Sequence, residues 1–198
     1  MNYLAHAYLS FNEPEILVGN MISDFVKGKN KFNYPLLVQK GITLHRAIDM
    51  FTDEHEATKK AKEIFRAEYR LYSGAFVDVV FDHFLAINEK EFAEASLLNF
   101  TEKTYQSLFP FTTIFPEQFQ KMFPYMQSQN WLYNYQFRWG IERSFGGLVR
   151  RAAYLSESEK AFVLFEKHYD ELQQYFNEFF PSLKNYASEK FNLLMTEN

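Results

Sequence analysis

Cysteine is absent from this 198-residue sequence. Disulfide bonds and thiolate metal ligands are therefore excluded. Any metal site would have to hold a hard or borderline divalent cation through histidine and carboxylate side chains.

Glycine and proline are scarce, with seven and six residues respectively. Strands joined by tight turns would need more of both, so helices are the default expectation. Hydrophobic residues make up 47% of the chain, and apolar positions recur at three- and four-residue spacing nearly throughout. A chain of this length can bury the core of one compact domain. We predict an all-α protein, a single-domain helical bundle over residues 1–198.

The expected helices are placed by proline, glycine and capping signals. They run from Pro14 to about Gly28, from Pro35 to about Phe51, from about Glu54 to Tyr72, and from Gly74 to Ile87 with Ser73 as N-cap. Further helices are expected at 90–108, 117–137, 139–154 and 157–196, with a loop at 109–116 and a kink or break at Pro181.

Long apolar runs are also missing. No uncharged stretch approaches the ~20 residues of a membrane-spanning helix. The first residues, MNYLAHAYLSFNEPE, lack the basic region and long apolar core of a signal peptide. We therefore expect a cytoplasmic protein with no membrane partner.

Positive charge is in deficit, because the formal net charge is −4. This balance disfavours duplex nucleic acid as a partner. Basic residues nevertheless cluster in two places, each of which is either a binding surface or an ordinary solvated face: Lys27, Lys29 and Lys31, and Arg138, Arg143, Arg150 and Arg151.

Aspartate is distributed differently from glutamate. Five of the six aspartates and four of the five histidines lie within residues 6–83, whereas glutamate is spread along the chain. Most of these residues sit in apolar segments, where a carboxylate is costly unless it is paired, hydrogen-bonded or bound to metal. The pattern indicates a polar site in the first half of the chain.

His45 and Asp49 are four residues apart on an expected helix, so their side chains share one face. Asp53 continues this stripe if the helix extends that far. The pair could bind one divalent ion, or it could be a hydrogen-bonded histidine with an acidic neighbour.

Asp78 and Asp82 repeat this spacing in the segment GAFVDVVFDHFLA, and His83 follows Asp82. A solvated face does not explain carboxylates among so many apolar side chains. They either form structural ion pairs or bind and orient a ligand. Adjacent Asp82 and His83 point about 100° apart on a helix, so both reach one site only between helices.

The remaining candidates are less constrained by their surroundings. Asp24 could be a ligand, could orient a ligating histidine, or could pair with Lys27. His6 lies in an apolar setting that also suits a core histidine. Arg46 could contact a phosphate or pair with an aspartate. His55 is expected to be solvated, and His168 to lie on the surface.

At these residues the chain resembles the acyl carrier protein phosphodiesterase family. The matching pieces are NYLAHAYLS, GNMISDFVKG, GITLHRAIDMFTDEH, VDVVFDHFLA and WLYNYQFRWGIERSFGGLVRR, in this order and over nearly the whole chain. The pieces that contain Asp24 and that contain His45 and Asp49 are the most specific.

The resemblance implies an HD-domain-like fold and hydrolysis of the phosphodiester that joins 4′-phosphopantetheine to a serine of holo acyl carrier protein. It also implies a divalent metal, with Mn²⁺ favoured and Mg²⁺, Fe²⁺ or Co²⁺ as alternatives. Asp82-His83 stands in place of the consecutive His-Asp of HD enzymes, so their ligand set cannot be copied. The candidate metal ligands are His6, Asp24, His45, Asp49, Asp82 and His83.

For catalysis we expect Asp24 or Asp78 to accept a proton from water, and Arg46 or Lys27 to offset phosphate charge. Because acyl carrier proteins are acidic, docking would need a basic surface, for which Lys27, Lys29, Arg150 and Arg151 are candidates. Two alternatives stay open: an HD-like phosphohydrolase of a nucleotide or small phosphoester, and a non-catalytic helical binding protein. The oligomeric state is not indicated by the sequence.

Overall fold

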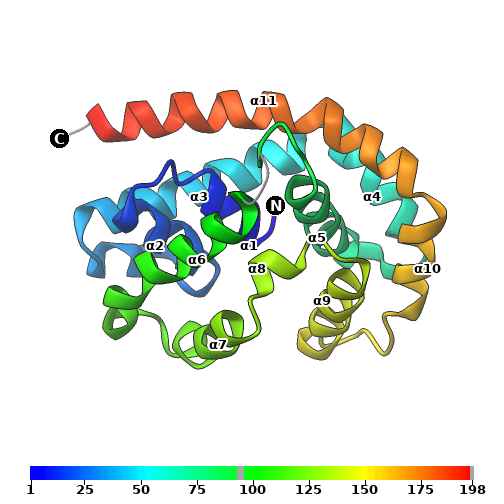
Figure 1. Cartoon of the computed structure of the whole chain (residues 1–198), viewed down its shortest axis with the longest axis horizontal. Coiled ribbons are helices and arrows are strands. Elements are labelled where there is room, and N and C mark those ends of the chain that lie inside the picture. Colours follow the sequence, from blue (N-terminus) through cyan, green and yellow to red (C-terminus); the bar gives the residue numbers. More distant parts are fainter. Residues whose placement is uncertain (93–95, 197–198) are drawn as a thin grey trace.

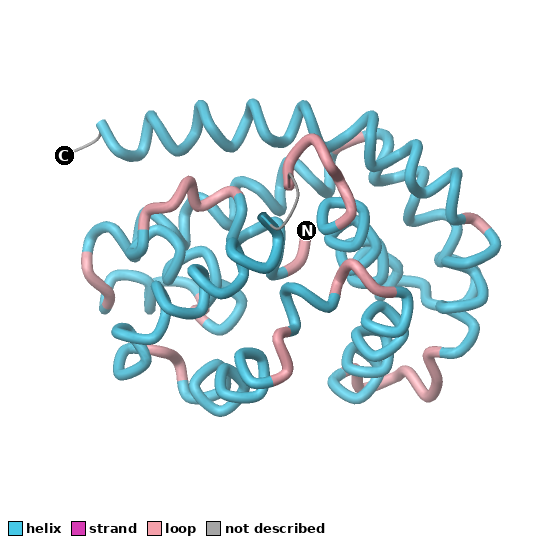
Figure 2. The backbone as a smooth tube through the Cα atoms, viewed as in Figure 1, coloured by secondary structure: helices cyan, strands magenta, loops and turns pink. Residues whose placement is uncertain are grey.

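A computed structural model describes residues 1–92 and 96–196. These residues form helices joined by turns and loops, and they contain no strand (Figures 1 and 2). The all-α prediction is therefore confirmed. Within this part of the chain, no helix is both long and apolar enough to cross a bilayer.

The α-helices are α1 (Tyr3–Tyr8), α2 (Pro14–Ile22), α3 (Leu36–Glu54), α4 (Glu56–Tyr69), α5 (Ser73–Ala86), α6 (Ser96–Leu108), α7 (Glu117–Ser128), α8 (Trp131–Asn134), α9 (Arg138–Arg151), α10 (Glu159–Lys167) and α11 (Tyr169–Thr196). Short 3-10 helices are η1 (Ser23–Phe25), η2 (Gly28–Asn33), η3 (Arg70–Tyr72) and η4 (Phe109–Ile114).

The expected helices exist, but several of their limits differ. The helix expected to reach Gly28 ends at Ile22, and Asp24 lies in η1. The expected loop at 109–116 is largely the 3-10 helix η4. Asn130, with a left-handed φ of 45°, separates α7 from α8 within the single helix expected at 117–137. Residues 90–92 are not helical, and 93–95 lie outside the described residues.

The capping role of Ser73 and the limits of the last helix also differ from the prediction. Ser73 is the first residue of α5 and donates a hydrogen bond to the Arg70 carbonyl instead of capping the helix. The helix expected over 157–196 is interrupted at His168, between α10 and α11, and α11 continues through Pro181.

Helix α5 is central, as its apolar sequence predicts. It packs against α1, α4, α9 and α11, and α11 lies along one long edge of the molecule, over α3, α4 and α5 (Figure 1). A single apolar cluster joins side chains from both ends of the chain. This core places the start of α1 directly against α5.

The two aspartates of α5 hold the N-terminal segment. Asp82 is fully buried and accepts hydrogen bonds from the backbone N–H groups of Asn2, Leu4 and Ala5 at 3.1, 2.7 and 3.3 Å. Asp78 accepts one from the Met1 amine at 2.8 Å. Burial raises the pKa of Asp82 to about 7, although the Met1 amine and the three N–H groups act in the opposite direction. These contacts fix α1, which carries His6.

Helices α2 and α3 touch backbone to backbone. A Cβ atom on Gly19 would lie 2.1 Å from the Val38 carbonyl oxygen, and one on Gly41 would lie 2.3 Å from the Ile16 carbonyl oxygen. Glycine is therefore required at both positions, because any side chain would push the helices apart. The close crossing brings Asn20 of α2 against His45 of α3.

We expect Gly41→Ala to lower the free energy of unfolding by more than about 3 kcal/mol, because the added methyl group overlaps a backbone oxygen that cannot rotate away. Gly147→Ala is the control, since its Cβ would lie 3.8 Å from Arg150 and alanine favours a helix. Urea denaturation of the two variants measures the difference, and equal stability would contradict the required contact.

Candidate metal centre

Three side chains from two helices converge on one point. His6 comes from α1, and His45 and Asp49 come from α3; one ligand atom of each lies within 4.8 Å of the other two. The imidazole rings are stacked, with centroids 3.9 Å apart and planes 16° apart. Both histidines are buried, whereas the Asp49 side chain is 40% exposed. The cluster therefore opens to solvent on the Asp49 side.

Asn20 orients both histidines. Its side-chain N–H group donates to the His6 carbonyl at 2.8 Å and to Ser10 Oγ at 3.1 Å, which leaves its Oδ1 facing His6 Nδ1 at 2.8 Å. The backbone carbonyl of Asn20 lies 2.7 Å from His45 Nδ1. Both Nδ1 atoms must carry hydrogen to donate to these oxygens, so each neutral imidazole presents a lone pair at Nε2.

Those lone pairs face carboxylate oxygens. His45 Nε2 lies 3.0 Å from Asp49 Oδ2, and His6 Nε2 lies 3.2 Å from Asp49 Oδ1. His6 Nε2 is buried and has no hydrogen-bond partner among the described residues. A lone pair and a carboxylate oxygen repel each other unless a proton or a metal ion lies between them. Two imidazole nitrogens and carboxylate oxygens are ligands that divalent transition metals accept, so the residues fit a metal ion.

The pKa values follow from this packing. Burial and the neighbouring His45 lower the pKa of His6, which stays neutral. Burial would lower the pKa of His45 as well, but hydrogen bonds and charge from Asp24 and Asp49 raise it to about 9. Burial would raise the pKa of Asp49, yet the two histidines hold it well below its usual range. Without metal, His45 carries the positive charge that the carboxylates require.

Asp24 joins the cluster from η1. Its Oδ1 lies 3.1 Å from His45 Nε2, and its side chain is 64% exposed. The hydrogen bond from His45 lowers the pKa of Asp24. Arg46 is exposed and donates to the Val26 carbonyl at 2.8 Å, so it ties the segment that carries Asp24 to α3. Arg46 pairs with no described aspartate, and Lys27 does not pair with Asp24.

The structure does not bring Asp78, Asp82 or His83 to the ligand cluster. Asp82 caps α1, as described above, and Asp78 pairs with the Met1 amine. His83 lies on another side of α5, where Nδ1 is 2.7 Å from the Tyr135 carbonyl and Nε2 is 2.9 Å from the Tyr169 hydroxyl. The ligand role expected for Asp82 and His83 is corrected accordingly, because backbone and side-chain partners already occupy both groups.

The other acidic and histidine candidates form contacts with residues outside the metal cluster. Asp53 lies 2.7 Å from Lys62 Nζ, and His168 Nδ1 lies 2.9 Å from Glu171. The prediction that His55 is solvated was wrong: it is half-buried, caps α4 through Ala57 N–H, and packs against Phe51 and Phe179.

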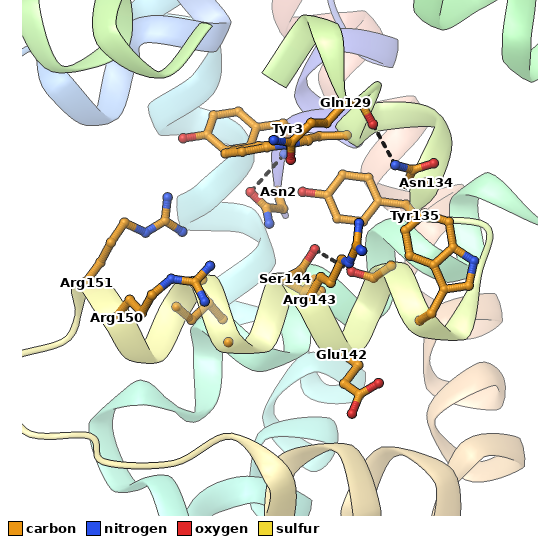
Figure 3. Close-up of a pocket in the computed structure, with 17 residues that line it drawn as sticks. Asn2, Tyr3, Gln129, Asn134, Tyr135, Glu142, Arg143, Ser144, Arg150 and Arg151 are labelled. Carbon is orange, nitrogen blue, oxygen red and sulfur yellow. Dashed lines mark hydrogen bonds between the residues drawn. The ribbon is translucent and has the colours of Figure 1, made fainter. Parts of the chain in front are cut away.

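The predicted basic residues are exposed and fall into two groups. Lys27 and Lys29 lie at the start of η2, close in sequence to Asp24. Arg150 and Arg151 end α9 and line a cavity of about 610 Å³ next to Tyr3, which precedes His6 on α1 (Figure 3).

Known proteins are similar to this chain over nearly its whole length. A profile of the acyl carrier protein phosphodiesterase family matches residues 1–183. The chain belongs to this family. The acyl carrier protein phosphodiesterases of Yersinia enterocolitica and Klebsiella pneumoniae are each 32% identical over 191 residues, which covers 96% of this chain and 99% of each relative. That of Photorhabdus laumondii is 32% identical, with 96% of both chains covered.

Family membership confirms the resemblance found in the sequence and its enzyme class, a phosphoric diester hydrolase. No solved structure matches the chain. The HD-like character of the helical fold therefore stays a prediction.

Sequence reasoning missed the part played by Asn20. The residue follows Gly19 and stands one turn before Asp24 in GNMISDFVKG, and a polar amide in this otherwise apolar helix was the available signal. It also missed Tyr3, whose place beside the cavity lined by Arg150 and Arg151 depends on the packing of distant segments.

We expect Mn²⁺ to raise the melting temperature of the wild-type protein, because a ligand that binds only the folded state stabilises it by about 2.7 kcal/mol at a hundred times Kd. Asp49→Asn should abolish this shift. Asp53→Asn is the matched control, one turn along α3 and outside the cluster. Thermal denaturation with and without Mn²⁺ measures both, and an unchanged shift in Asp49→Asn would remove this residue from the site.

The raised pKa of His45, about 9, also predicts proton release. At pH 7 its Nε2 is protonated in the metal-free protein, and a metal ion can bind there only after that proton leaves. Binding should therefore release about one proton, and affinity should rise with pH up to about 9. Calorimetry in two buffers of different ionisation enthalpy counts the protons. Metal binding with no proton release at pH 7 would refute this assignment.

Proposed function

We propose that this protein is a metal-dependent phosphodiester hydrolase that removes 4′-phosphopantetheine from holo acyl carrier protein and leaves the apo carrier protein. The observation that carries the proposal is the pair of imidazole Nε2 atoms, from His6 and His45, that face carboxylate oxygens at a cluster open to solvent. Membership of a family of acyl carrier protein phosphodiesterases supplies the substrate.

The proposed ligands of a divalent ion are His6, His45 and Asp49, with Asp24 as a further carboxylate donor. A metal ion bound there would lower the pKa of a water molecule and polarise a phosphoryl oxygen. Manganese is the proposed ion, with magnesium, iron(II) or cobalt(II) as alternatives, because the donor set has nitrogen and oxygen but no sulfur. Three buried or half-buried ligands leave further positions open for water and substrate.

In the proposed reaction, a water oxygen forms the new bond to phosphorus, and the bond between phosphorus and the serine oxygen breaks. The water loses a proton, and the serine oxygen gains one. Asp24 is the proposed proton acceptor, because its exposed carboxylate is ionised and lies 3.1 Å from His45 Nε2. Asp78 is less suitable, because it already accepts a hydrogen bond from the Met1 amine.

Arg46 keeps a proposed role in offsetting phosphate charge. Its hydrogen bond to the Val26 carbonyl uses only Nη2, and a guanidinium carries five N–H groups. The group is exposed next to the cluster, so its other N–H groups are accessible to a phosphate oxygen.

We propose the η2 segment as the surface that meets the carrier protein. The η2 segment here means residues 27–36, from Lys27 just before η2 to Leu36 at the start of α3. Lys27 and Lys29 are exposed in it, and so are the apolar side chains of Phe32 and Leu36, at 63% and 58%. Positive charge around exposed apolar groups suits an acidic protein with an apolar contact face. The segment follows Asp24 directly, so a carrier protein bound there would lie beside the metal cluster.

Replacement of Asp24, His45 or Asp49 should reduce release of phosphopantetheine at least about a hundredfold, since each group touches the proposed metal or water. The substitutions are Asp24→Asn, His45→Gln and Asp49→Asn. Mass spectrometry of holo carrier protein incubated with Mn²⁺ measures the product, and Asp53→Asn and His55→Gln are the controls.

Full activity in a folded Asp49→Asn variant would overturn the site. A wild-type protein that leaves holo carrier protein intact but hydrolyses a nucleotide or small phosphoester would replace the substrate. A protein that binds no metal and turns over neither substrate would be a non-catalytic binding protein.

A further inference from the structure

A cavity of about 610 Å³ lies between α9 and the segment that enters α1 (Figure 3). This volume is typical of sites for small organic ligands. Its walls combine aromatic rings with guanidinium groups, chiefly Tyr3, Trp131, Trp139, Arg143, Arg150 and Arg151. The proposed hydrolysis at the metal cluster does not involve this cavity.

The cavity carries uncompensated positive charge. None of the three lining arginines forms an ion pair with a described carboxylate; Arg143 instead lies over the Trp139 ring at 5.1 Å. The one lining acid, Glu142, points away from the arginines in Figure 3. Guanidinium groups gathered without carboxylate partners indicate an anionic ligand, and a phosphate suits their planar geometry.

Tyr3 connects this cavity with the metal cluster. The Tyr3 hydroxyl and Arg151 Nη1 each lie 4.0 Å from the Met122 sulfur, so the two groups share one end of the cavity. Tyr3 is three residues before His6 on α1. Burial raises the pKa of the Tyr3 hydroxyl, and the charge of the nearby Arg151 guanidinium acts in the opposite direction. The Arg151 end of the cavity is therefore linked through Tyr3 and α1 to the cluster.

The floor of the cavity is open because two helical positions lack side chains. Gly146 and Gly147 line it, and Cβ atoms there would lie 3.5 and 3.8 Å from the Arg150 guanidinium. Alanine would fit at either position, but a larger side chain would occupy the cavity. A long, thin ligand can therefore lie along α9 between the glycines and the aromatic rings.

We infer that this cavity binds the 4′-phosphopantetheine arm, with Arg150 and Arg151 on its phosphate and the chain of two amide groups along α9 toward Trp131 and Trp139. This inference rests on the proposed function, which supplies the phosphopantetheine. Arg150 and Arg151 would then bind the phosphopantetheine arm, and the η2 segment would contact the protein part of the substrate.

The test measures binding of free 4′-phosphopantetheine, inorganic phosphate and pantetheine to the full-length protein with Mn²⁺, by calorimetry. The variants are Arg151→Gln, Arg150→Gln and Gly147→Leu. Arg66→Gln is the matched control, because Arg66 is an exposed arginine on α4 that pairs with Glu63 outside the cavity. Circular dichroism verifies folding, and the exposed Arg150 keeps the test valid if Gly147→Leu does not fold.

We expect wild-type protein and Arg66→Gln to bind 4′-phosphopantetheine at least tenfold more tightly than inorganic phosphate. Gly147→Leu should weaken binding of phosphopantetheine at least tenfold, because the leucine side chain would occupy the cavity beside the Arg150 guanidinium. Arg150→Gln and Arg151→Gln should weaken binding of phosphopantetheine by a similar factor and should also weaken phosphate.

Equal affinity for phosphopantetheine and phosphate, or variants that bind phosphopantetheine as wild type does, would overturn the inference. So would variants that raise only the KM for holo carrier protein, because the arginines would then contact the carrier itself. Hydrolysis of holo carrier protein by the wild type is scored separately. If the wild type hydrolyses holo carrier protein but the variants still bind phosphopantetheine as the wild type does, only the role of the cavity is refuted. If the wild type binds phosphopantetheine at the cavity but does not hydrolyse holo carrier protein, only the proposed function is refuted.

Discussion

Direct backbone contact between α2 and α3 is the constraint on which the site depends. With no side chain at Gly19 or Gly41, the Asn20 carbonyl can approach to 2.7 Å from His45 Nδ1. The Asn20 side-chain amide also contacts His6 on α1. One buried residue therefore sets the tautomers of two histidines from different helices, and a wider α2–α3 crossing would release His45 from it. The metal cluster is in this sense a product of helix packing and not of its ligands alone.

The sequence predicted those parts of the site that are local to one helix. His45 and Asp49 meet because a four-residue spacing places them one turn apart, whatever the rest of the chain does. His6 and Asp24 reach the same point through contacts between distant segments, which spacing cannot reveal. The helices themselves followed from apolar periodicity, whereas breaks such as Asn130 depend on a single left-handed residue and escaped prediction.

The polar pairs of α3 and α5 have the same four-residue spacing, but their side chains have different partners. Each places a carboxylate four residues after another polar side chain, His45 before Asp49 on α3 and Asp78 before Asp82 on α5. On α3 the neighbouring groups are imidazole lone pairs, which need a cation beside the carboxylate. On α5 the neighbours are N–H groups of the N-terminal segment, which satisfy Asp82 without one. Burial cost identifies a carboxylate that must have partners, but only the packed structure identifies those partners.

A chain with a formal net charge of −4 can bind a phosphodiester if its positive charges are concentrated where the phosphate binds. The carboxylates Asp24 and Asp49 are held beside histidines, where a divalent cation would neutralise their negative charge and so remove its repulsion of a phosphate. The unpaired guanidinium groups of α9 line a cavity with Tyr3, which stands three residues before His6, and they add positive charge there. Net charge is an average over the whole surface, whereas a ligand responds to the field in the cleft that it enters. An acidic protein can therefore present a locally cationic path to the phosphate and its arm.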